Sequence, residues 1–198
     1  MLRYGFEREY FVLKGKQHVA VPKYMPEDAC GYLAEARGLP ATTPIDAVYN
    51  LFAAEYKLQA EAKKNNVRLS CKPATRELPR EFTKHMLQTH GKNIAKSHNA
   101  YGYVFPDNNY SYAGLHVHFS DQRDITHIGP ANTTQTVIAA QLDMPRIINA
   151  LDRKFIKEIA EAKRQEGWYE LKPWGFEYRS LPASIDAVLV AEFLCTLI

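Results

Sequence analysis

Pairs of ionisable residues separated by a single residue recur in four segments, and they constrain the fold more than any other feature of the chain. The pairs are Glu7 and Glu9, Glu35 and Arg37, His116 and His118, and Glu177 and Arg179. Residues two apart on a β-strand point to the same face of a sheet, so each strand would present its whole pair on one side. Ala36, Val117 and Tyr178 lie between pair members and suit a buried opposite face, whereas Arg8 breaks that pattern.

Four such strands in one sheet would gather carboxylates, imidazoles and guanidinium groups on a shared face. Neighbouring carboxylates repel one another and shift each other's pKa, so the cluster needs cations to offset its charge. Arginines would supply part of that charge. Mg²⁺ or Mn²⁺ would supply it better, because these ions prefer carboxylate oxygen with some imidazole. Each pair alone is more typical of a solvated strand face or a structural ion pair, so their coincidence is what indicates a metal site.

Composition narrows the class of protein. The chain has 198 residues, enough for one domain with a substantial core, and it is 46% hydrophobic and 24% charged. A net charge of +3 gives no reason to expect nucleic acid as a partner. We expect no membrane partner, because the chain has neither an 18-residue apolar run nor a signal peptide, and we expect a cytoplasmic location. Cys30, Cys71 and Cys195 lie far apart in the sequence, which favours reduced thiols over a disulfide framework or zinc site.

The pattern of the first half predicts strands over 5–13 and 17–21, joined as a hairpin at Gly15. A strand is predicted over 31–37, with a helix as the alternative because Leu, Ala, Glu and Arg favour helices. Thr43 and Pro44 predict the start of a helix that runs to 64. The expected buried residues of that helix are Ile45, Val48, Leu51, Phe52 and Leu58. A strand over 67–71 and a helix over 79–90 follow.

The second half begins with an aromatic loop over 101–112, interpreted as a packed surface loop rather than a lid or an adenine-stacking wall. A strand is predicted over 113–120, then a helix over 133–164 that is interrupted or re-started at Pro145. A strand pair over 168–171 and 176–181 precedes a closing helix over 184–198 with Ser184 as its cap. This order predicts a single α+β domain spanning 1–198, with a largely antiparallel sheet and helices on one face.

Three of these segments resemble strands of the glutamine synthetase catalytic domain. The segments are GFEREYF at 5–11, AGLHVHFS at 113–120 and FEYR at 176–179, and they follow one another in the same order. The stretch 164–184 (RQEGWYELKPWGFEYRSLPAS) is closer still to the phage-type carboxylate–amine ligases of that superfamily. The segment 28–37 is similar to their strand with a third carboxylate, and Pro106-Asp107 to a Pro-Asp in their aromatic loop.

The resemblance implies a half-barrel fold and an ATP-dependent amide-forming ligase that acts through an acyl phosphate with Mg²⁺ or Mn²⁺. It implies two metal sites, one held by Glu9 and Glu35 and the other by Glu7, His116 and Glu177. Arg179 would stabilise the transferring phosphoryl group, and His118 and Lys172 would lie near the nucleotide. Arg37 and Arg164 are candidates for contacts with the substrate carboxylate or a phosphate.

The same resemblance implies small-molecule or peptide carboxylates and amines as substrates, host cytoplasm as the location if the chain is phage-encoded, and leaves a homo-oligomer open. The sequence departs from the phage-type pattern at Glu170, where arginine is expected, and at Pro182-Ala183-Ser184. It is also short for the superfamily, as expected of a trimmed or solitary domain. The alternatives are a phosphotransferase resembling guanidine kinases, a metal-dependent hydrolase using His116 and His118, and an inactive nucleotide-binding relative.

Overall fold

The computed structural model describes residues 2–28, 31–75, 97–102, 111–121, 142–172 and 174–197. The predicted helix over 79–90 lies outside the described residues. So do the first part of the predicted helix over 133–164, up to 141, and residues 103–110 of the aromatic loop.

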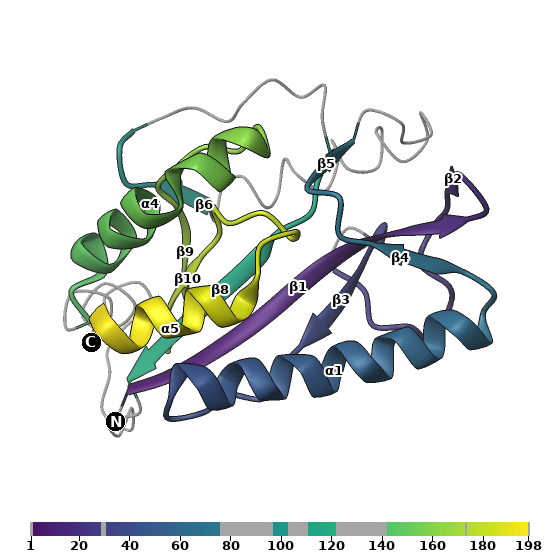
Figure 1. Ribbon diagram of the computed structural model, residues 1–198, viewed down its shortest axis with the longest axis horizontal. Coiled ribbons are helices and arrows are strands. Elements are labelled where there is room, and N and C mark those ends of the chain that lie inside the picture. The colour runs from purple at the N-terminus through teal and green to yellow at the C-terminus, as the bar shows by residue number, and fades with distance from the viewer. Residues whose placement is uncertain are drawn as a thin grey trace.

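One large sheet organises the described part of the chain, and its pairings are antiparallel. Its strands are β1 (Leu2–Lys14), β2 (Gln17–His18), β3 (Leu33–Arg37), β4 (Arg68–Ser70), β6 (Ser97–Asn99), β8 (Leu115–Asp121), β9 (Trp168–Lys172) and β10 (Gly175–Tyr178). The main path runs β2-β1-β8-β10-β9-β6, and β3 and β4 also pair with β1. The short strands β5 (Ala74–Thr75) and β7 (Ser111–Tyr112) form a separate pair. Figure 1 shows the long β1 running diagonally through the molecule.

The helices of the described residues are α1 (Pro44–Lys64), α4 (Met144–Glu161) and α5 (Ala187–Leu197). In Figure 1, α1 lies along β1 and β3, and α5 lies across the strands beside it. Their buried side chains and those of α4 belong to one hydrophobic cluster with the apolar face of the sheet. Among the described helices, none combines the length and the apolarity needed to cross a membrane.

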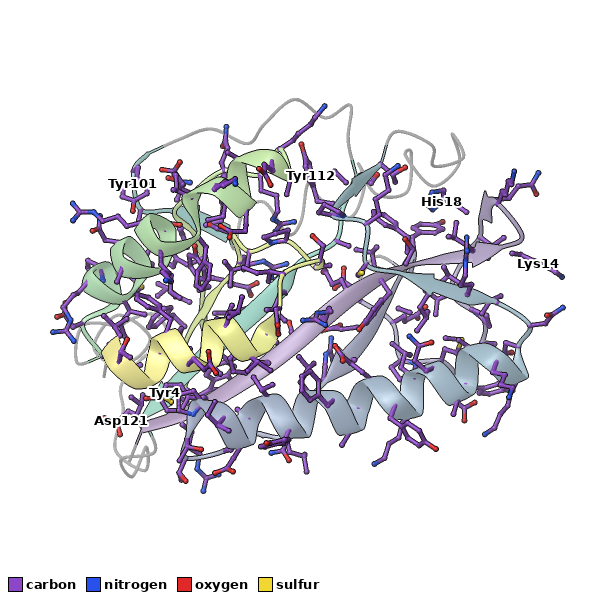
Figure 2. The ribbon with its side chains drawn as sticks, in the orientation of Figure 1. Tyr4, Lys14, His18, Tyr101, Tyr112 and Asp121 are labelled. Carbon is purple, nitrogen blue, oxygen red and sulfur yellow. The ribbon has the colours of Figure 1, made fainter. Side chains whose placement is uncertain are left out.

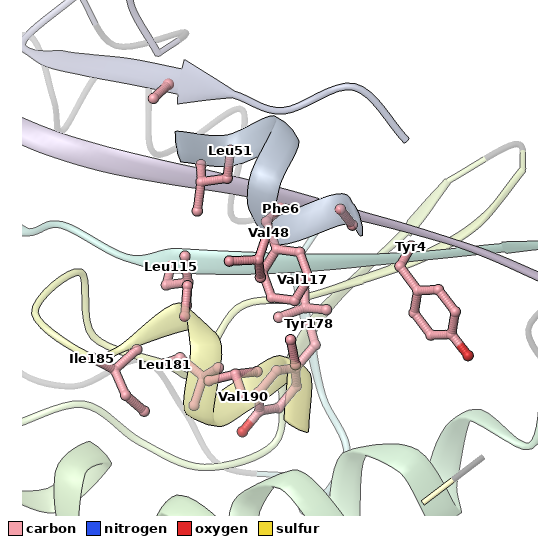
Figure 3. Close-up of a cluster of buried hydrophobic side chains, with 14 of the residues drawn as sticks. Tyr4, Phe6, Val48, Leu51, Leu115, Val117, Tyr178, Leu181, Ile185 and Val190 are labelled. Carbon is pink, nitrogen blue, oxygen red and sulfur yellow. The ribbon is translucent and has the colours of Figure 1, made fainter. Parts of the chain in front are cut away.

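Packing in the core explains why apolar and ionisable residues alternate along the strands. Phe6 lies opposite Val117, and Val117 in turn lies opposite Tyr178, so apolar side chains next to the ionisable residues form one continuous layer. Figure 3 shows these residues meeting Val48 of α1 and Val190 of α5. Burying such large apolar side chains contributes roughly 1.5–3 kcal/mol each. The energy of this layer fixes the register, because a slip of one residue would turn every ionisable pair into the core.

Most predicted elements are confirmed, including the strand interpretation of 31–37 and the hairpin, in which Gly15 adopts φ 62°. Figure 2 shows Lys14 and His18 together at the hairpin end of β1. Thr43 caps α1 as predicted, accepting a hydrogen bond from the Asp46 amide. The α+β class with an open, mostly antiparallel sheet is also confirmed.

Two local predictions are wrong, and one is confirmed. Phe52 is 37% exposed rather than buried, because it projects between the core face and the solvent face of α1. Ser184 does not cap the last helix, since α5 begins at Ala187 and the Asp186 carboxylate accepts from the Val188 amide. The predicted re-start of a helix at Pro145 is confirmed, since α4 begins at Met144 and Pro145 occupies its first turn, where its missing N–H costs nothing.

Candidate metal and anion site

The face of the sheet opposite the helices carries the ionisable pairs, as the alternation predicts. Register brings them together: Glu7 pairs with both Arg37 and His116, and Glu9 pairs with Glu35. On the other side, Glu177 pairs with His118 and with Glu170. Five neighbouring strands, β3-β1-β8-β10-β9, therefore contribute to one cluster.

His116 lies at the centre of this cluster and is 3% exposed. Its Nδ1 is 3.1 Å from Glu7 Oε1 and 3.0 Å from Glu177 Oε1, and its Nε2 is 3.8 Å from Glu9 Oε2. Burial lowers the pKa of His116, but the charge of Glu9 and the hydrogen bonds to Glu177 and Glu7 outweigh burial and raise it to about 10. His116 is thus an internal cation that links three carboxylates.

A group of donor atoms suited to a metal lies beside His116. One atom each from Glu7, His118 and Glu177 lie within 4.8 Å of one another. His118 Nε2 is 3.2 Å from Glu7 Oε2. The sequence prediction placed His116 with Glu7 and Glu177, and the structure brings all four together but adds His118 as the third donor of the compact group.

Glu177 is the most buried carboxylate of the group, with 1% of its side chain exposed. Its Oε1 lies 3.0 Å from both Arg179 Nη1 and His116 Nδ1. A carboxylate this buried needs cationic partners, and two carboxylates with one imidazole suit Mg²⁺ or Mn²⁺. The residues present therefore fit a hard divalent cation.

The second predicted metal pair, Glu9 and Glu35, lies on adjacent strands and is also buried. Glu9 Oε2 accepts a 2.7 Å hydrogen bond from the Gly114 amide. Glu35 accepts two hydrogen bonds from Arg37, at 2.8 and 2.6 Å. Burial raises the pKa of Glu9, and burial together with the charge of Glu7 raises that of Glu35 to about 8 despite Arg37.

The carboxylates nearest the imidazoles, those of Glu7 and Glu177, have lowered rather than raised pKa values. Burial raises the pKa of Glu7, but hydrogen bonds to His116 and His118 outweigh it and hold that pKa well below its usual range. Burial is likewise outweighed at Glu177, where the hydrogen bond and charge of His116 and the charge of Arg179 lower the pKa. Pairs whose environments drive pKa values apart are typical of functional sites, although structural ion-pair networks produce them too.

Cations line the β9–β10 side of the cluster in a closed ring of ion pairs. Lys172 Nζ lies 2.7 Å from Glu177 Oε2 and 2.9 Å from Glu170 Oε1. Arg179 Nη1 lies 3.0 Å from both Glu177 Oε1 and Glu170 Oε2. Lys172 and Arg179 are 23% and 28% exposed, so both can reach a ligand at the surface of the site.

Arg164 lies at the back of the cluster, where burial lowers its pKa to about 10. Its guanidinium donates to the main-chain carbonyl oxygens of Ser180, Ala113 and Arg179. These bonds tie the segment after α4 to the ends of β8 and β10. Arg164 therefore lies with the other site residues, but its donors are directed at backbone.

Three nearby residues were not singled out from the sequence. Glu170 was noted only as a departure from the family pattern, yet it closes the ion-pair ring. Trp174 packs against His118 with 5.3 Å between ring centroids. Asp152 of α4 is buried and accepts hydrogen bonds from Tyr178 and Tyr101 at 2.6 and 2.8 Å, joining α4 to the sheet. An aromatic residue in the turn between two ionisable strands was the available signal for Trp174.

Comparison of the chain with family models, with curated proteins and with solved structures finds no match in any of the three.

Proposed function

We propose that the chain is an ATP-dependent carboxylate–amine ligase that works with divalent metal ions. One observation carries the proposal: buried Glu177 forms a compact donor group with Glu7 and His118, in which one donor atom of each residue lies within 4.8 Å of the others. The sequence resemblance supports the same conclusion, and it adds that the sheet is the curved half barrel of glutamine synthetase-like enzymes.

In this proposal Glu7, His118 and Glu177 hold one ion, and Glu9 with Glu35 hold a second. Bound Mg²⁺ or Mn²⁺ would neutralise the phosphate oxygens of ATP and the charge that develops during phosphoryl transfer. His116 orients the ligands from behind, since its ring nitrogens contact Glu7, Glu9 and Glu177. Such outer contacts fix the direction of ligand oxygens and tune affinity.

Arg179 and Lys172 bind the phosphate groups. A planar guanidinium can hold two phosphate oxygens through parallel hydrogen bonds, whereas an ammonium acts as a movable point charge. Glu170 contacts both cations, so they keep a partner on one side while they face ATP on the other. Arg37, which is 64% exposed next to Glu35, is placed to bind the substrate carboxylate.

The proposed reaction has two steps. A carboxylate oxygen of the substrate attacks the γ-phosphorus of ATP, the bond to the β-phosphate oxygen breaks, and an acyl phosphate and ADP form. The amine nitrogen then attacks the acyl carbon, inorganic phosphate leaves, and the proton lost by the amine passes to a carboxylate of the site. Holding both substrates against one face lowers the entropy cost of each step.

The test is ADP release from ATP and Mg²⁺ with panels of amino acids, short peptides and polyamines, with mass spectrometry of the products. We expect ADP release that needs both a carboxylate and an amine, and an amide product. Arg179→Gln should lower the rate by about 100-fold or more, since phosphate-stabilising groups contribute on that scale. Arg153→Gln, on the exposed side of α4, is the control.

Other outcomes would identify other functions. A phosphorylated product without an amide would indicate a phosphotransferase, and hydrolysis without ATP would indicate a metal hydrolase. ATP binding without turnover for any acceptor would indicate an inactive relative.

A further inference from the structure

An aromatic stripe runs along the solvent side of α1, away from the site. Tyr49, Phe52 and Tyr56 are 66%, 37% and 79% exposed, and they follow one another at spacings of three and four residues. Gln59 and Lys63 continue the same spacing toward the C-terminal end of the helix. Alternating steps of four and three place these residues on one seam of a helix, which is the pattern of a helix that packs against another helix.

The stripe is large for a surface feature of one helix. At roughly 200 Å² for a whole aromatic side chain, its three rings expose on the order of 350 Å². Apolar patches of this size on a monomer often mark an interaction site. The elements that α1 contacts most, β1, α5, β3 and β4, pack against its other side.

We propose that the stripe is a dimer interface, in which α1 packs antiparallel against α1 of a second copy of this chain. Charge at the two ends of the helix argues for this partner. Asp46 lies in the first turn, and Lys63 and Lys64 lie in the last turn, all exposed. Antiparallel packing centred at the level of Ala54 puts Phe52 opposite the second copy's Tyr56, and Asp46 beside its Lys63 and Lys64.

This arrangement uses the same patch on both copies, as a two-fold interface requires. A parallel arrangement would bring Asp46 to Asp46 and lysine to lysine, so the charges select the antiparallel one. Two stripes and their flanking side chains approach the lower end of stable interfaces, near about 1,200 Å². The expected dimer is therefore of micromolar affinity rather than obligate.

The experiment is sedimentation velocity of the full chain across a concentration series. We expect a reversible monomer–dimer equilibrium. The double variant Tyr49→Lys with Tyr56→Lys should weaken dimerisation by about 30-fold or more, because it buries like charges at the centre of the interface. Leu189→Lys, which alters an equally exposed apolar residue on α5, should leave the equilibrium unchanged.

Charge exchange tests the antiparallel register directly. A chain that carries Asp46→Lys alone should not form a dimer with itself. A chain that carries Lys63→Asp and Lys64→Asp should not form a dimer with itself either. Mixing those two chains should restore a dimer, and the triple exchange within one chain should dimerise by itself. Circular dichroism checks that each variant remains folded.

The proposal is overturned if the unchanged chain stays monomeric up to about 200 µM, which is a hundred times the expected dissociation constant of about 2 µM. It is also overturned if the tyrosine variant dimerises as well as the unchanged chain, or if the exchanged chains do not complement. Binding of the monomer to phosphatidylserine–phosphatidylcholine vesicles through Tyr49 and Tyr56 would replace the dimer with a membrane-surface role.

Discussion

The ammonium of Lys172 lies 2.7 Å from Oε2 of Glu177, the carboxylate that forms the donor group with Glu7 and His118. Lys172 thus shares a carboxylate with the proposed metal. Its second partner, Glu170 at 2.9 Å, can retain the ammonium when Glu177 turns toward an ion. Removing the ammonium of Lys172 should therefore change the affinity for metal and the affinity for nucleotide in opposite directions.

Replacing Lys172 with Met should tighten Mn²⁺ binding in the absence of nucleotide by about tenfold, since it removes a competing charge near the ligand carboxylate. The same change should weaken ATP binding in the presence of Mn²⁺. Isothermal titration calorimetry measures both, with Lys157→Met on the exposed side of α4 as the control. Equal changes of the same sign in both titrations would contradict the shared-carboxylate arrangement.

Glu177→Gln keeps the shape of the side chain but removes its charge. We expect Mn²⁺ affinity to fall by at least about 100-fold, and unfolding of the metal-free protein to become easier by about 1–3 kcal/mol as buried cations lose their partner. Glu158→Gln, at an exposed position of α4, should change neither quantity. Calorimetry and urea unfolding give the two values. An unchanged Mn²⁺ affinity would show that Glu177 is not a ligand of the ion.

The metal-free protein should lose stability as pH rises from about 6.5 to 10. The folded-state pKa of His116 is raised to about 10, so its contribution is complete below its ordinary pKa and lost as pH rises through 10. The pKa of Glu35 is raised to about 8, and because the fold favours its neutral form, its contribution also disappears as pH rises through 8. Glu7 and Glu177 have lowered pKa values and stay charged across this range.

Urea unfolding at pH 6.5, 8 and 10 measures this slope, which can reach about 1.4 kcal/mol per pH unit for one group. His116→Gln should flatten the upper part of it. Saturating Mg²⁺ should reverse the trend, because the ion competes with protons for the same side chains. A metal-free protein that gains stability between pH 6.5 and 10 would refute these assignments.

Gly114 leaves room for His116. A Cβ at position 114 would lie 2.6 Å from His116 Nε2, so Gly114→Ala must push the imidazole off its carboxylates. We expect a loss of about 1–3 kcal/mol in stability, as for other overpacked sites, and weaker Mn²⁺ binding. Gly5→Ala is a matched control, since its Cβ would make an ordinary 3.4 Å contact with His118. Similar losses for both glycines would show that packing at 114 has no special role.

Much of the site could be predicted because alternation in a strand is local. Glu7, Glu9, His116 and Glu177 each share a face with their partner two residues away, and the apolar residues Val117 and Tyr178 between the pairs on their strands leave one choice of burial. Alternation could not rank His118 against His116 as a ligand, because both point the same way. That distinction depends on register, which places Glu177 opposite His118 and Glu7 opposite His116.

Other features of the site and the fold depend on tertiary contacts that the spacing of residues in the sequence does not predict. Glu170 joins Lys172 and Arg179 only because β9 and β10 are paired in one register. Phe52 lies at the boundary between two faces of α1, where a helical pattern assigns an aromatic residue to the core by default. Tertiary packing left it at the surface, in line with Tyr49 and Tyr56.

The most direct test of the metal and ATP assignment is a crystal structure with Mn²⁺ and a non-hydrolysable ATP analogue. The proposed arrangement predicts an anomalous peak within about 2.3 Å of oxygens of Glu7 and Glu177 and of a nitrogen of His118, with the nucleotide phosphates between that ion and Arg179. No peak on this face of the sheet at saturating Mn²⁺ and nucleotide would contradict it.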